Sequence, residues 1–173
     1  MRKSRIAAAV AVKALLALLL AFVADVATAQ LAPASAPLPA WAEAAWQSLA
    51  TQQGLARRTR LDPSIQTADF DGDGRADLAV LVVHVASRKE GIALLFRSRP
   101  ARVFGAGRPF GNGGDDFAWV DTWRVEPREQ ARSVRGGRPL HIDGAGLVVE
   151  KESSASALIY LDSGRPRWRQ YGD

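Results

Sequence analysis

Residues 69–85 read DFDGDGRADLAVLVVHV and join an acidic, glycine-containing loop to a long apolar run. In the run, Leu78, Val80 and Val82 fall on one face of an extended chain, and the intervening residues, which are also apolar, fall on the other. A strand that is apolar on both faces is buried on both faces. We therefore expect residues 76–85 to form a central strand of a sheet, entered through the acidic loop.

Working outward from this strand, the alternation of apolar residues and the turn residues between the runs predict further short strands. They cover residues 64–70, 91–97, 117–125, 146–151, 155–161 and 165–171. Before them, residues 40–53 form a helix-type pattern, with Trp41, Ala44, Ala45 and Leu49 on one face and Gly54 as the C-cap. We predict an α+β fold, with one N-terminal helix packed on a mainly antiparallel sheet of about six or seven strands.

The first 29 residues have the features of a secretory signal peptide. Arg2, Lys3 and Arg5 precede an apolar stretch, and Ala27-Thr28-Ala29 is an A-x-A cleavage site. An uncleaved membrane anchor is the alternative, since the stretch is long enough to cross a bilayer. The predicted organisation is a signal peptide at 1–29, an Ala/Pro-rich linker at 30–39 and a single α+β domain at 40–173, in a periplasmic or secreted protein with no membrane span after cleavage.

Charge and cysteine content exclude several classes of function. Removal of residues 1–29 leaves 23 − 4 = 19 basic and 18 − 1 = 17 acidic residues, a net charge of +2, which gives no support for nucleic-acid binding. The chain has 0 cysteines. It therefore has no disulfides, no thiolate metal site, no cysteine nucleophile and no lipoprotein anchor.

The acidic loop has the composition of a calcium site. Four carboxylates this close repel one another unless a cation lies among them, and hard oxygen ligands favour Ca²⁺. The expected ligands are the side chains of Asp69, Asp71, Asp73 and Asp77 and the backbone carbonyl of Arg75. Val80 stands where a helix-loop-helix site places its bidentate glutamate, so a strand-loop-strand site is the better interpretation. An acidic turn without a metal is the alternative.

Residues 69–78, DFDGDGRADL, resemble the calcium loop of FG-GAP repeats, written D-x-[DN]-G-D-G-x-x-D before an aliphatic residue. The resemblance implies that these aspartates ligate structural Ca²⁺ in a β-hairpin. FG-GAP repeats build propeller blades used in adhesion or recognition, but the loop occurs once here and no second copy follows at a regular period, so the propeller does not carry over. The chain also resembles small secreted bacterial proteins that pair one such loop with a strand like residues 153–160, a resemblance that supplies no activity.

Two further groups of residues are candidates for binding or chemistry. Asp115 and Asp116 follow two glycines and could complete the calcium shell or form a solvated turn. Asp121 lies between Trp119 and Trp123 on one face of the predicted strand, where two indoles around a carboxylate would suit a sugar if the face is open. If that face is closed, Asp121 must be paired.

The sequence therefore predicts a secreted or periplasmic calcium-binding module rather than an enzyme. Its expected partner is an unknown protein or a component of the cell envelope, and the expected state is a monomer. One alternative is a carbohydrate-active or other hydrolase that uses Asp115, Asp116 or Asp121 near Trp119 and Trp123. Another is an envelope protein with a purely structural role.

Overall fold

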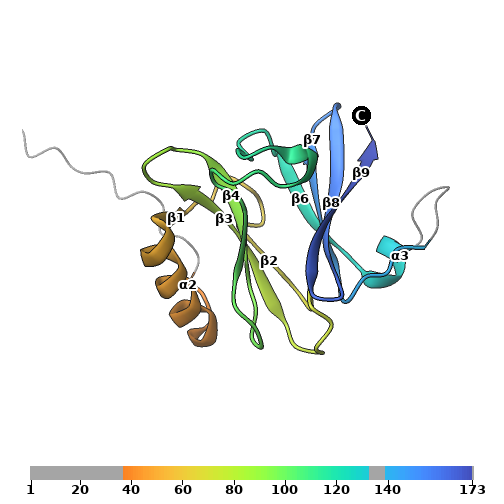
Figure 1. Ribbon diagram of the computed structural model, residues 1–173, viewed down its shortest axis with the longest axis horizontal. Helices are drawn as coiled ribbons and strands as arrows, with labels where there is room; N and C mark the ends of the chain where they lie inside the picture. The colour runs from red at the N-terminus through yellow and green to blue at the C-terminus, as the bar shows by residue number, and fades with distance from the viewer. Residues whose placement is uncertain (1–36, 133–138, 173) are drawn as a thin grey trace, which may run out of the picture. The chain divides into compact units, whose positions relative to one another are not determined.

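The computed structural model describes residues 37–132 and 139–172, which form two antiparallel sheets (Figure 1). The first sheet has five strands: β1 (Leu55–Arg57), β2 (Ile65–Ala68), β3 (Asp77–His84), β4 (Glu90–Leu95) and β5 (Arg102–Gly105). The second has four: β6 (Thr122–Glu126), β7 (Gly146–Lys151), β8 (Ala155–Asp162) and β9 (Arg165–Gly172). The predicted signal peptide lies outside the described residues, as does most of the linker.

The predicted fold class was wrong, because the described residues are mostly β and their strands divide between two sheets instead of forming one. The order in the first sheet is β1-β3-β4-β5 with β2 also pairing β3, and in the second it is β6-β7-β8-β9. No pairing joins β5 to β6 within the described residues. The strand at 77–84 is central in its sheet, as expected, since β3 pairs β1 and β2 along one edge and β4 along the other.

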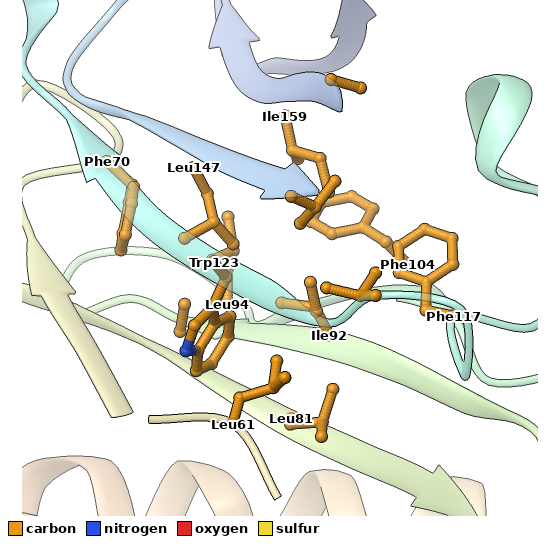
Figure 2. Close-up of a cluster of buried hydrophobic side chains, with 14 of the residues drawn as sticks. Leu61, Phe70, Leu81, Ile92, Leu94, Phe104, Phe117, Trp123, Leu147 and Ile159 are labelled. Carbon is orange, nitrogen blue, oxygen red and sulfur yellow. The ribbon is translucent and has the colours of Figure 1, made fainter. Parts of the chain in front are cut away.

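The two sheets pack face to face over one apolar core. Leu81 and Leu94 reach into this core from β3 and β4, and Trp123, Leu147 and Ile159 reach into it from the second sheet (Figure 2). Because alternate residues of a strand point to opposite faces, Val80 of β3 points the other way. The strand β3 is thus buried on both faces, which explains its unbroken apolar sequence.

A helix packs against the outer face of each sheet. α2 (Ala40–Gln53) places Trp46 and Leu49 against Val80 and its neighbours on the outer face of the first sheet. α3 (Arg128–Arg132) contributes Ala131 to a smaller cluster with Val148 on the outer face of the second. No helix of the described residues is long and apolar enough to cross a membrane.

The helix α2 has the predicted bounds but presents a different face to the sheet. Its C-cap is Gly54, which adopts the left-handed φ of 62° that glycine tolerates. Ala44, predicted on the buried face, is exposed, whereas Ala42 and Trp46 are buried. Apolar residues occur on nearly every side of this helix, so its sequence period did not select one face.

Residues 106–121, the crossing segment, carry the chain from the first sheet to the second. A 3₁₀ turn (η1, Gly111–Gly113) lies within this segment, and Phe117 and Val120 insert into the shared core with no exposed surface. The Arg60 guanidinium holds the segment in place by donating hydrogen bonds to the carbonyls of Phe117 and Val120. Arg60 also forms an ion pair of 2.7 Å with Glu90.

Candidate metal centre

The acidic loop joins two neighbouring antiparallel strands. β2 pairs β3 with Ala68 opposite Asp77, so residues 69–76 close a hairpin. Gly72 and Gly74 have φ values of 77° and 82°, a region that costs other residues strain. The predicted position of the loop between two strands is therefore confirmed, and the two glycines account for the sharp course of the loop.

Asp69 organises the first half of the loop. Its carboxylate accepts hydrogen bonds from the backbone N–H groups of Gly72 at 2.7 Å, Asp73 at 3.1 Å and Gly74 at 2.9 Å. These three amides point inward because the chain wraps around the side chain, as in an Asx turn extended by two residues. Asp69 is therefore fixed by its own loop.

Asp71 is half-buried, like Asp69, and Asp73 is exposed. Asp71 accepts a hydrogen bond of 3.0 Å from the Ser98 hydroxyl, which follows β4 in the chain. Asp73 accepts one of 2.8 Å from the Arg75 amide. The nearby Ser98 hydroxyl and this amide keep the pKa of Asp73 below its ordinary value. Ser98 was not anticipated from the sequence, because only the pairing of β3 with β4 brings it to the loop.

Asp77 is the buried member of the loop, with no exposed surface. Its carboxylate accepts backbone hydrogen bonds from Phe70 at 3.1 Å and from Arg97 at 3.2 Å. Burial, with a smaller contribution from the negative charge of Asp71, raises the pKa of Asp77 to about 6. A buried carboxylate beside a second carboxylate is an environment that a bound cation would stabilise.

The structure brings three of the predicted ligands together. One carboxylate oxygen each from Asp69, Asp71 and Asp77 lies within 4.8 Å of the other two. Asp73 is outside this group. Arg75 contacts the loop through its backbone amide, which donates a hydrogen bond to Asp73. Ca²⁺ takes six to eight oxygens, so three carboxylates can supply part of such a shell, with backbone carbonyls and water for the remainder. The donor set thus fits a hard cation.

A turn from the second sheet supports the loop from outside. The Ala145 amide donates a hydrogen bond of 2.7 Å to the Asp69 carbonyl. A Cβ on Gly144 would lie 2.2 Å from that same carbonyl oxygen, and one on Gly72 would lie 2.5 Å from the Asp143 carbonyl oxygen. Nothing in the sequence indicates that residues 143–145 meet the acidic loop, which comes much earlier in the chain.

The other predicted acidic residues have structural partners. Asp115 forms an ion pair with Lys89. Asp116 accepts backbone hydrogen bonds of 2.9 and 3.0 Å, and Asp121 accepts one of 3.1 Å. Within the described residues, Asp115 and Asp116 do not belong to the group of acidic side chains that could share a metal ion.

The predicted strand face with two indoles around Asp121 does not form, since β6 begins only at Thr122. Trp123 is buried in the core and donates a hydrogen bond of 2.7 Å to the Pro63 carbonyl. Trp119 lies in the crossing segment and donates one of 3.0 Å to Gly113. The two rings therefore belong to different environments.

Comparison of the chain with protein-family models, with curated proteins and with solved structures gave no match.

Proposed function

We propose that this protein is a secreted or periplasmic binding module, without enzymatic activity, in which the acidic loop holds one structural Ca²⁺. The convergence of oxygens from Asp69, Asp71 and Asp77 within 4.8 Å is the observation that carries this proposal. Asp73 and the Arg75 carbonyl complete the proposed ligand set, as the loop sequence suggests. The ion would bind the hairpin end of β2 and β3 and offset the charge on buried Asp77.

A structural role is favoured over a catalytic one by the way the loop is built. The carboxylates of Asp69 and Asp77 already accept backbone hydrogen bonds that fix the loop. A metal held mainly by loop groups that are fixed in this way leaves little room for a substrate. The ion therefore contributes to stability, and the partner, a protein or a component of the cell envelope, binds elsewhere on the surface.

Calcium-dependent thermal melting tests the metal. At a free Ca²⁺ concentration 100 times the Kd, the folded state gains about 2.7 kcal/mol, which corresponds to a rise of roughly 10 °C in Tm. Asp71→Asn should abolish most of this rise, because it removes the charge of one ligand. The side-chain oxygen that remains can still accept the hydrogen bond from Ser98. Asp121 is an exposed carboxylate outside the loop, so Asp121→Asn should leave the rise in Tm unchanged.

Two results would contradict the metal proposal. One is a Tm that does not respond to Ca²⁺ added after treatment with a chelator. The other is an equal rise in the wild type and in Asp71→Asn. Mg²⁺ should give a smaller rise than Ca²⁺, because it demands a tighter octahedral shell than a wrapped loop provides.

Secretion and the oligomeric state are tested separately. Protein recovered from a periplasmic extract should have the mass of a chain that begins at Gln30, whereas the mass of the uncleaved chain in the membrane fraction would contradict the proposed export. Light scattering during gel filtration should give the mass of one chain, as expected for a monomer.

A further inference from the structure

We propose that the hollow lined on one side by Trp119 and Trp168, together with the hollow beside it, binds a neutral saccharide of two or more pyranose rings. The first hollow has a volume of about 390 Å³, within the range of small-molecule sites. It lies between the crossing segment and the ends of β7, β8 and β9. The inference specifies the ligand of the binding role proposed above, and it does not depend on the metal.

The two indoles provide the apolar wall of this hollow. Trp119 and Trp168 meet edge to face, with ring centroids 6.4 Å apart and planes at 71°. Trp119 donates its N–H to the Gly113 carbonyl at 3.0 Å, and Trp168 donates its N–H to the Gln170 side chain at 3.2 Å. Since both N–H groups are already used, the indoles offer a ligand their carbon surfaces.

Trp168 is held in position by the glycines of the crossing segment. A Cβ on Gly111 would lie 2.2 Å from the Trp168 ring, and one on Gly113 would lie 2.8 Å from it. The backbone therefore lies directly against the indole, which also packs edge-on against Phe110 at a centroid distance of 6.0 Å. A rigid aromatic wall costs little entropy on binding, because its side chains are ordered beforehand.

Polar side chains also line the hollow. Asn112 and Lys151 are exposed, and within residues 37–132 and 139–172 neither side chain has a hydrogen bond or ion pair. An amide both donates and accepts, and an ammonium donates. Apolar walls with a few polar groups at the rim suit a sugar ring, which has C–H groups on its faces and hydroxyls around its edge.

A second hollow of about 350 Å³ adjoins the first, and Lys151 and Ala155 line both. Its lining is rich in hydroxyl groups, supplied by Thr122, Ser153, Ser154 and Ser156. A ligand that occupies both hollows must be elongated, with an apolar face at one end and hydrogen-bonding groups at the other. A short chain of pyranose rings meets both requirements.

The charges around the two hollows favour an uncharged ligand. The cationic Lys151 is accompanied by Glu150 and Glu152, which both line the second hollow. Glu150 also forms an ion pair of 3.6 Å with Arg124. Positive and negative groups are thus close to balance, whereas a site for a polyanion requires a clear excess of positive charge.

The test is a tryptophan-fluorescence titration of the whole protein with three neutral trisaccharides. They are the β-1,4-linked trimers of glucose and of N-acetylglucosamine and the α-1,4-linked trimer of glucose, each taken to millimolar concentrations. At least one should change the emission in a saturable way. Saturation-transfer NMR should place the ring C–H protons of that sugar, rather than its reducing end alone, against the protein.

Variants locate the site. Ala155→Gln puts a larger side chain between the two hollows and should weaken binding at least tenfold. Ala56→Gln, at an exposed position of β1 in the other sheet, should not weaken it. Asn112→Ala and Lys151→Ala should each weaken binding about fivefold, the effect of one lost hydrogen bond. Both of these positions are exposed, so their variants should melt at the wild-type temperature.

Three outcomes would overturn the inference. They are the absence of binding by all three sugars, binding that Ala155→Gln leaves unchanged, and binding of polygalacturonate alone with an affinity that falls at high salt. Titrations with Ca²⁺ and with a chelator separate this inference from the metal proposal. Lost sugar binding with an intact calcium-dependent rise in Tm contradicts the sugar site alone, and the reverse result contradicts the metal alone.

Discussion

Three glycine-to-alanine variants separate backbone strain from steric contact at the acidic loop. Gly74 has a φ of 82° and no atom within 4 Å of an added Cβ. Gly144 has no left-handed φ, but its Cβ would lie 2.2 Å from the Asp69 carbonyl oxygen. Gly72 combines both conditions, with a φ of 77° and a Cβ 2.5 Å from the Asp143 carbonyl oxygen.

The expected losses of unfolding free energy follow from these differences. Gly74→Ala should cost roughly 1 to 2 kcal/mol, the strain of a left-handed residue. Gly144→Ala should cost roughly 1 to 3 kcal/mol, because a backbone atom must move to admit the methyl group. Gly72→Ala should cost roughly the sum, about 2 to 5 kcal/mol, if the two costs are independent.

Urea unfolding monitored by tryptophan fluorescence measures all three variants under the same conditions. It should be run in a chelator, so that differences in metal affinity do not enter the comparison. Equal losses for Gly72→Ala and Gly74→Ala would refute the reasoning, because they would mean that the turn at 143–145 does not press on the loop. A neutral Gly144→Ala would refute it for the same reason.

Two further predictions concern the crossing segment and the second sheet. Arg60→Lys should lower the unfolding free energy by about 2 kcal/mol in urea unfolding, because an ammonium cannot bond Glu90 and the two carbonyls together. Arg102 is exposed, so Arg102→Lys should leave the unfolding free energy unchanged. Burial, and then the charge of Glu126, raise the pKa of Tyr171 to about 12. Since an unfolded tyrosine ionises near pH 10, stability from this group is fully present below pH 10 and is lost as the pH rises through about 12. Absorbance titration should show the high pKa in the wild type and a lower one in Glu126→Gln, and an unchanged pKa in that variant would contradict the assigned role of Glu126.

Local features of the chain could be predicted where short-range chemistry determines them. The helix from Ala40 to Gln53 and the strands β3, β7 and β9 were placed within one or two residues of their observed bounds. The acidic hairpin was identified because its spacing of aspartates and glycines has a conformational meaning of its own. Three of its five predicted ligands do converge.

The division into two sheets could not be predicted, because alternation shows which residues share a face but not which strands pair. β1 and β5 lie in arginine- and glycine-rich segments and have only three and four residues. The run at 117–121 looked like a strand, yet Phe117 and Val120 are buried at a spacing of three, with the Val120 amide bonded to the Phe117 carbonyl at 3.0 Å. A turn that inserts into the core produced an apparent alternation.

The support of the acidic loop by the second sheet has a consequence for the order of folding. Asp69 and Ala145, joined by their backbone hydrogen bond, are 145 − 69 = 76 positions apart in the chain. Closing so long a stretch has an entropic cost, and contacts of this kind form slowly compared with a hairpin. The loop can turn early, but it acquires its final support only after β7 has been positioned. A cation that prefers the supported loop would therefore bind late and would act on the rate of unfolding more than on the rate of folding.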